Sequence, residues 1–350
     1  MELLIWCTCA MSWTTWEGTI SRMKLLIITN NPDRASFRQR IGVYLDILKA
    51  SSIDCEVAQL PVGFSARHKL FKRAVGFDGV FLHKKGLNVL DALSLRRHSR
   101  KIIYNFDDAV MYSDRNPERY SRSHFVPFRR SVRLADLVIT GSTYLAEHAR
   151  KFNSNVEVLP IGLKVSDYKP DGRVRADDKI RLVWIGSRST LGYLEEIRPA
   201  LEQIGSRFDT IILRIIGDQF LDLNNMPVEK RLWSMDTRGI DLASSDIGLA
   251  PLPDNRFTRG KCSFKVLEYS AAGLPVIASP VGTNCEYVKE GTTGFLAADT
   301  RQWVDKMIQL IGSPQLRKQM GRAGLELAAN FDVKVIGRKL CDLITMCMKE

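Results

Sequence analysis

Short apolar runs alternate with stretches of helical periodicity along most of the chain, and this alternation limits the possible folds more than any other feature. The first run, 24–29, ends in Asn30, Asn31 and Pro32, which is typical of a buried parallel strand followed by a loop. The strand-like runs of the first half are 24–29, 55–60, 79–82, 101–104, 137–140 and 156–159. Alternation of this kind predicts a parallel sheet with helices on both faces.

A break in the pattern divides the chain. Segment 159–172 carries turn residues and little periodicity, so we interpret it as a linker. The second half then offers strands at 180–185, 210–216, 246–250, 275–279 and 294–296, and helices at 191–204, 263–272, 300–311, 314–329 and 333–348. The 350 residues suit two domains at ~100–200 residues each. We expect two consecutive doubly wound α/β domains, 23–163 and 164–332, with ligands beyond the carboxyl ends of the strands. We expect 1–22 to be a poorly ordered extension.

The chain carries a net charge of +12, which favours anionic partners such as nucleotides or lipid headgroups. Many of the basic residues lie in the first half: Lys69, Lys72, Arg73, Arg96, Arg97, Arg100, Lys101, Arg119, Arg122, Arg129, Arg130 and Arg133. The seven cysteines include no Cys-x-x-Cys pair, so we expect reduced thiols and neither a disulfide framework nor a zinc site. No apolar run approaches the ~20 residues that span a bilayer.

The stretch 259–279 is the strongest candidate for chemistry. If 262–272 is a helix, then Lys261, Lys265 and Glu268 fall in one polar row. Lys261 lies near the helix start, where free N–H groups already favour an anion such as a diphosphate. Glu268, about one turn further on, suits hydrogen bonds from ribose hydroxyls. The alternative is a solvated face whose lysine–glutamate pair contributes only ~0.3–0.5 kcal/mol.

A second candidate follows the run 180–185. Gly186 permits a tight turn, and a helix begins near Thr190, so this turn can present backbone donors and Arg188 to phosphate. The alternative is an ordinary structural turn. The residues expected to hold a nucleotide donor are therefore Gly186, Ser187, Arg188, Lys261, Ser263, Phe264, Lys265 and Glu268.

The first half offers candidates at the ends of its expected strands. Asp107 and Asp108 suit a general base, acceptor hydroxyls or a metal, although adjacent carboxylates often only cap a turn. His83 is a similar case, more often structural than catalytic. Arg38 and Arg40 follow the first strand and would meet a phosphate-bearing acceptor if their helix faces the cleft. The alternative for both is a surface position.

Together these segments resemble the retaining glycosyltransferases of the GT-B fold, in the group called family four or glycosyl transferases group 1. The resemblance is closest from Trp184 to Phe331 and looser in the first half. It includes the segments 251–253, 260–265, 267–269, 272–279, 281–284 and 290–296. So many matches in the same order are more specific than any single motif.

The resemblance implies a cleft between two Rossmann-like domains, with the acceptor on the first, the donor on the second, and the last helix, 333–350, returning to the first. Glu268 matches the glutamate that holds the ribose, while Arg188 and Lys261 look like cations around the donor diphosphate. Many relatives carry another glutamate at the position of Gly260, so recognition of the sugar must differ here. Retention of configuration and catalysis without a metal or other cofactor are also implied.

We therefore expect a cytoplasmic hexosyltransferase-like enzyme of cell-envelope polysaccharide synthesis. Its catalytic candidates are Arg188, Lys261, Asp107 and Asp108. Its partners would be a nucleotide sugar, a glycan or lipid-linked acceptor and an anionic membrane face, but not nucleic acid. The alternatives are a sugar-nucleotide epimerase or phosphorylase on the same fold, and a non-catalytic basic module that binds membranes or nucleic acid.

Overall fold

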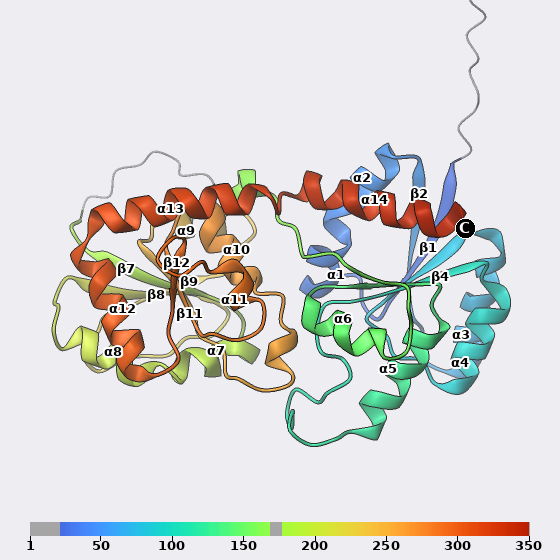
Figure 1. Cartoon of the computed structure of the whole chain (residues 1–350), viewed down its shortest axis with the longest axis horizontal. Helices are drawn as coiled ribbons and strands as arrows, with labels where there is room; N and C mark the ends of the chain where they lie inside the picture. The colour runs from blue at the N-terminus through green and yellow to red at the C-terminus, as the bar shows by residue number, and fades with distance from the viewer. Residues whose placement is uncertain (1–21, 169–176, 350) are drawn as a thin grey trace, which may run out of the picture.

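The computed structural model describes residues 22–168 and 177–349, which form two α/β domains side by side (Figure 1). Apart from Arg22, the extension expected at 1–22 lies outside the described residues, and so does part of the linker. The two six-stranded sheets are parallel throughout. The predicted pair of doubly wound Rossmann-like domains is confirmed.

The N-terminal sheet has the spatial order β2-β1-β3-β4-β5-β6. Its strands are β1 (Met23–Thr29), β2 (Ile53–Gln59), β3 (Gly79–His83), β4 (Lys101–Phe106), β5 (Leu137–Thr140) and β6 (Val156–Val158). Its helices are α1 (Ala35–Arg40), α2 (Leu45–Ala50), α3 (Phe64–Arg73), α4 (Val89–His98), α5 (Arg122–Leu134) and α6 (Thr143–Arg150). Alternate strand residues point to opposite faces, so Leu26 and Ile28 pack with α3 to α6, whereas Leu25 and Ile27 pack with α1 and α2.

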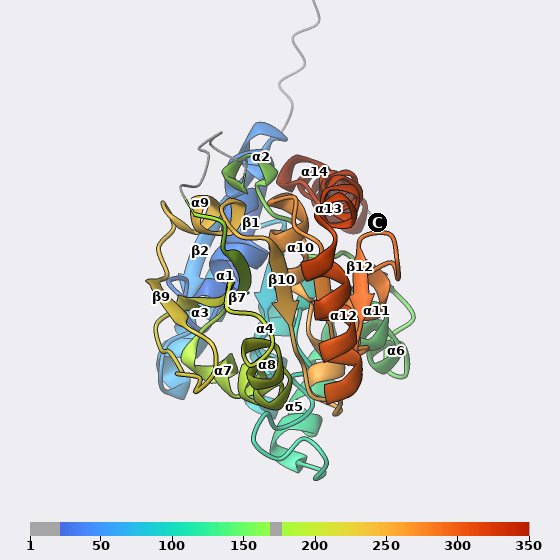
Figure 2. The same cartoon turned by 90° about the vertical axis from the view of Figure 1, so that its left-hand side faces the viewer.

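The C-terminal sheet has the order β12-β11-β10-β7-β8-β9, with helices on both sides of its strands (Figure 2). Its strands are β7 (Ile180–Ile185), β8 (Ile211–Gly217), β9 (Val228–Leu232), β10 (Ile247–Ala250), β11 (Val276–Ala278) and β12 (Gly294–Leu296). Its helices are α7 (Arg188–Glu195), α8 (Arg198–Gly205), α9 (Arg238–Ala243), α10 (Phe264–Ala271), α11 (Asn284–Tyr287), α12 (Thr300–Gly312) and α13 (Pro314–Ala329).

Some elements differ from the sequence-based expectation. The single helix expected at 191–204 is two helices, α7 and α8, and Pro199 lies in the first turn of α8. Proline has no N–H to continue the hydrogen-bond ladder of α7 and is favoured in the first turn of a helix, which explains the division. Strand β9 was not expected, because its sequence, Val-Glu-Lys-Arg-Leu, is mostly charged and it occupies an exposed edge of the sheet.

The chain crosses to the N-terminal domain between α13 and the last helix, α14 (Val333–Lys349), which lies along that domain (Figure 1). The buried face of α14, which includes Ile336, Leu340 and Ile344, belongs to the same core cluster as Leu25 and Ile27 of β1. The chain therefore leaves the C-terminal domain through α13 and ends packed on the N-terminal one. Within the described residues, no helix has both the length and the apolar character needed to cross a bilayer.

Candidate functional site

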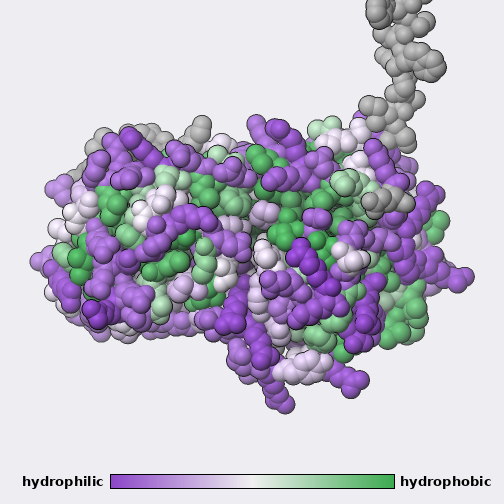
Figure 3. Space-filling view, viewed as in Figure 1, coloured by the Kyte–Doolittle hydropathy of each residue, from purple (hydrophilic) through white to green (hydrophobic). Residues whose placement is uncertain are grey.

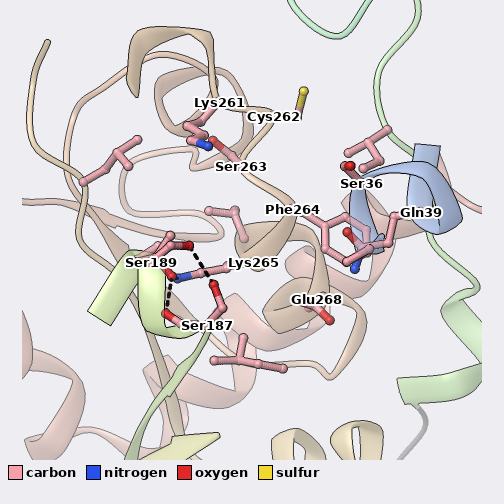
Figure 4. Close-up of a pocket in the computed structure, with 18 of the residues that line it drawn as sticks. Ser36, Gln39, Ser187, Ser189, Lys261, Cys262, Ser263, Phe264, Lys265 and Glu268 are labelled. Carbon is pink, nitrogen blue, oxygen red and sulfur yellow. Dashed lines mark hydrogen bonds between the residues drawn. The ribbon is translucent and has the colours of Figure 1, made fainter. Parts of the chain in front are cut away.

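A cleft of about 590 Å³ lies between the two domains. Its walls come from residues that directly follow the carboxyl ends of β1, β3 and β4 on one side, and of β7 and β10 on the other, together with α10. In Figure 4, Lys261, Lys265 and Glu268 of the C-terminal domain lie opposite Ser36 and Gln39 of α1. This is where parallel sheets are expected to place a ligand.

Glu268 lies on the cleft wall with 5% of its surface exposed. The Tyr168 hydroxyl donates to Glu268 Oε1 (2.9 Å), and Arg238 Nε donates to the Tyr168 oxygen (3.1 Å). Burial raises the pKa of Glu268 to about 7, although Tyr168 and Arg238 favour the ionised form. The predicted ribose-binding residue is therefore a buried carboxyl held in one orientation by two partners, not half of an exposed surface pair.

Lys265 occupies the first turn of α10 and lines the same wall. Its Nζ lies 4.1 Å from the centre of the Trp184 ring and 3.4 Å from Thr190 Oγ1. Burial lowers its pKa to about 7, against the attraction of Glu268. A side chain on Gly186 would place its Cβ only 2.7 Å from this Nζ. The absence of a side chain at Gly186 therefore leaves space for the Lys265 ammonium. A phosphate in this cleft would add to the attraction of Glu268 and favour the charged form of Lys265.

Lys261 forms an ion pair across the cleft. The helix begins at Phe264, later than expected, because Ser263 adopts a left-handed conformation with φ of 47° and Lys261 itself is extended. Lys261 is thus not in one helical row with Lys265. Its Nζ reaches Asp108 Oδ1 of the N-terminal domain (3.0 Å). Burial favours a lower pKa for Lys261, but the negative charge of Asp108 outweighs burial and raises this pKa above its ordinary value.

The two predicted aspartates share a lysine that the sequence reasoning missed. Lys84 Nζ lies 3.1 Å from Asp107 Oδ1 and is also paired with Asp108. Burial disfavours ionisation of Asp107, but Lys84 and Arg40 hold its pKa below the ordinary value. An alternating chain of charges, Asp107–Lys84–Asp108–Lys261, therefore joins the two domains. Of the two carboxylates, Asp108 is the less buried and the better placed for an acceptor hydroxyl.

The remaining predicted residues divide into those that line the cleft and those that do not. The lining includes Gly186, Ser187, Ser263, Phe264 and Arg38. The Arg188 side chain is exposed and not part of the lining, while its backbone N–H donates to Asp218 Oδ1 (2.6 Å). The structure therefore does not bring its guanidinium to the cleft wall.

The prediction for Arg40 is wrong. Arg40 is only 2% exposed and donates to the carbonyl of Leu159 (2.6 Å) and to Asn105 Oδ1 (3.4 Å). It therefore lies beneath the cleft, where it cannot contact an acceptor directly. His83 is also buried: its Nδ1 lies 3.1 Å from Thr29 Oγ1, and burial lowers its pKa to about 4.

Gly260 lies where the C-terminal domain touches the N-terminal one. A Cβ built there would be 2.8 Å from the Ala109 Cβ and 2.9 Å from a Leu145 methyl. Next to it, the Cys262 thiol donates to the Asp107 carbonyl (3.0 Å). A glutamate at this position, as the resemblance would have suggested, does not fit this arrangement of the domains.

The charged side chains of the cleft indicate what kind of ligand it could hold. Within residues 22–168 and 177–349, no three His, Cys, Asp or Glu side chains cluster in a way that could hold a metal ion. The cations that face the cleft are instead Lys84, Lys261, Lys265 and Arg38. Fixed ammonium groups suit an anionic ligand without further counter-ions.

The similarity to known proteins agrees with this site. A family model described as "Glycosyl transferases group 1" matches residues 194–313. This segment, about a third of the chain, is thus similar to that family. The D-inositol 3-phosphate glycosyltransferase of Corynebacterium diphtheriae is 40% identical over 76 residues, 21% of this chain and 18% of that protein. The N-acetyl-alpha-D-glucosaminyl L-malate synthase of Bacillus anthracis is 27% identical over 173 residues, 46% of this chain and 44% of that protein. The chain thus matches less than half the length of each relative.

Solved structures confirm the two-domain GT-B fold. Anabaena HepE in complex with UDP and glucose has a TM-score of 0.71 and 17% identity, over 93% of this chain and 100% of that one. The sucrose-phosphate synthase of Thermosynechococcus elongatus has a TM-score of 0.69 and 15% identity, over 93% and 99%. The GT-B resemblance inferred from the sequence is confirmed, and at these identities the structural likeness itself concerns the fold alone.

Proposed function

We propose that this protein transfers a glycosyl group from a nucleoside-diphosphate sugar to a glycan or lipid-linked acceptor, with retention of configuration. The observation that supports this most is the combination of Lys261, Lys265 and the buried Glu268 on one wall of the cleft. The segment that matches the family model, 194–313, includes these three residues. HepE, a protein of similar fold, has been solved with UDP. On this proposal the diphosphate lies by the lysines and the ribose by Glu268.

The proposed chemistry follows from charge. Departure of a nucleoside diphosphate builds negative charge on its oxygens, and fixed cations stabilise that charge without reorganising. Lys261 and Lys265 would supply this stabilisation, so we propose that neither a metal nor another cofactor takes part. The acceptor would enter beside Arg38 and Asp108 on the opposite wall. A hexose as the transferred group and a role in cell-envelope polysaccharide synthesis belong to the same proposal.

A thermal-shift screen against uridine, guanosine and adenosine diphosphates tests the donor site. We expect at least one nucleotide to raise Tm, because ligand at about 100 times its Kd stabilises the folded state by about 2.7 kcal/mol. The Glu268→Gln and Lys261→Ala variants should remain folded and lose that shift. If neither variant changed the response, these residues would not belong to the nucleotide site.

Donor affinity should be highest near pH 7. Binding needs ionised Glu268 and protonated Lys265, and burial brings both pKa values to about 7, from opposite directions. Below that pH Glu268 is protonated, and above it Lys265 is neutral, so affinity should fall on each side by up to about tenfold per pH unit. Isothermal titration with a nucleotide sugar between about pH 6 and pH 8 measures this.

The variants of these two residues assign the two limbs of the pH profile. Glu268→Gln should flatten the acid limb, and Lys265→Met the alkaline one. An affinity that did not change with pH in the unmodified protein would show that neither proton is linked to donor binding.

A further inference from the structure

Apolar side chains are exposed together at the start of two neighbouring helices of the N-terminal domain. Val62 and Phe64 stand at the start of α3 and are 96% and 48% exposed. Val89, Leu90 and Leu93 of α4 are 53%, 59% and 65% exposed. Figure 3 shows hydrophobic residues gathered over α3 and α4 at the lower right. We call these five residues the α3–α4 patch. Large apolar groups exposed together mark an interaction surface more often than scattered ones do.

The two helices hold the patch together as one surface. Arg67 of α3 pairs with Asp91 of α4 (3.2 Å between Nε and Oδ1), and His68 Nδ1 lies 2.7 Å from Ser94 Oγ. The Phe64 ring stacks on His68 (centroids 5.9 Å apart). Helices α3 and α4 therefore lie side by side, and the five exposed apolar residues all lie toward the N-terminal ends of the two helices.

The exposed charged residues of α3 and α4 are all basic. Helix α3 contains no acidic residue, and the only one in α4, Asp91, is 1% exposed and paired. Exposed basic residues follow the apolar ones along the same two helices, and α5, which packs beside α4, adds two more. The exposed basic residues of these three helices include Lys69, Lys72, Arg97, Arg129 and Arg133. Apolar side chains with a cationic surround complement the interface of an anionic bilayer.

The patch also lies close to the acceptor wall of the cleft. Lys84, which lines the cleft, is followed within a few residues by Val89 and Leu90, and both helices start at the carboxyl ends of strands. A bilayer that contacts this patch therefore passes near the acceptor entrance. An acceptor carried on a lipid would reach the cleft from that side.

We infer that the α3–α4 patch docks on an anionic lipid bilayer, with Leu90 and Leu93 inserted among the acyl chains and the basic residues against the headgroups. This extends the proposed function, since it places a lipid-linked acceptor beside the cleft, but lipid binding itself does not require donor chemistry.

Sedimentation with vesicles tests the inference. The full chain should sediment with vesicles of phosphatidylcholine plus phosphatidylglycerol, less so as salt rises, and not with phosphatidylcholine alone. Two variants, Leu90→Ser/Leu93→Ser and Lys69→Glu/Arg97→Glu, should each bind these vesicles at least about tenfold more weakly than the unmodified protein. Leu232→Ser changes a leucine of the C-terminal domain that is 74% exposed and should bind as the unmodified protein does.

Two controls separate this inference from the proposed activity. Glu268→Gln should retain vesicle binding, and Leu90→Ser/Leu93→Ser should retain any Tm shift given by a nucleotide diphosphate. The inference fails if the unmodified protein does not sediment with vesicles that contain phosphatidylglycerol. It also fails if the two patch variants bind these vesicles as well as Leu232→Ser does. It also fails if Leu90→Ser/Leu93→Ser converts a dimer into a monomer without affecting lipid binding, since the patch would then be a contact between copies of the chain.

Discussion

Replacing Lys261 with alanine should lower kcat/KM by about 10²–10³-fold, which corresponds to a loss of about 2.7–4 kcal/mol of transition-state stabilisation. Lys261 is the donor-side cation that reaches furthest across the cleft, since its Nζ contacts Asp108 of the other domain. On the proposed function, this ammonium faces the diphosphate as it leaves. Steady-state kinetics with the nucleotide identified by thermal shift measures the effect.

A charge-preserving variant and a distant one make the result specific. Lys261→Arg should recover part of the activity, and Lys318→Ala, at an exposed position of α13, should leave it unchanged. A loss in Lys318→Ala as large as in Lys261→Ala would point to a general effect of surface charge. Unaltered kcat/KM in Lys261→Ala would remove this residue from the mechanism.

The ion pair with Asp108 has a consequence for nucleotide binding. Asp108 competes with a diphosphate for the Lys261 ammonium, and Lys84 remains to neutralise Asp107 when Asp108 is absent. Asp108→Asn should therefore strengthen nucleotide binding even if it reduces turnover. Opposite effects of Asp108→Asn and Lys261→Ala on Kd would indicate that the nucleotide displaces this ion pair.

The fold could be predicted from the sequence because its signals are local. Short apolar runs between turn residues mark most of the buried strands, and Gly273, with φ of 73°, follows the end of α10 where the sequence placed a helix stop. Strand β9 lacks such a signal, because an edge strand needs little apolar surface and its identity depends on pairing with β8.

The C-terminal wall of the cleft was also predictable, since Gly186, Lys261, Lys265 and Glu268 belong to two short segments. Other partners could not be found in that way. Tyr168 is 100 residues from Glu268 in sequence and contacts it only because the domain folds. The contact between Lys84 and Asp107 could have been predicted. Lys84 follows β3 just as Asp107 follows β4, and these two strands are neighbours.

The error over Arg40 has a geometric cause. Arg38 and Arg40 are two residues apart in α1, and residues with this spacing are about 200° apart around a helix. They cannot both face the cleft. Sequence reasoning placed both at the cleft, with a surface position as the alternative, whereas the structure exposes Arg38 and buries Arg40 against the carbonyl of Leu159.

Glu268→Gln should weaken binding of a ribonucleoside diphosphate by about 10–100-fold, since hydrogen bonds to a charged group contribute about 1.5–3 kcal/mol. Glutamine has nearly the same shape as glutamate, and its amide oxygen can still accept from Tyr168. The variant therefore keeps the buried contact and loses the charge that ribose hydroxyls would meet. Isothermal titration gives Kd, and Glu326→Gln, on the exposed surface of α13, is the matched control.

A sugar-modified nucleotide distinguishes loss of ribose contacts from general damage. The unmodified protein should prefer the ribonucleotide over its 2′,3′-dideoxy analogue, because a buried carboxyl without its hydroxyl partners is left unsatisfied. In Glu268→Gln that preference should largely disappear, so the two ligands should bind with similar, weak affinity. If the variant instead weakened both ligands equally and kept the preference, Glu268 would support the fold of the cleft through Tyr168 and some other group would hold the ribose.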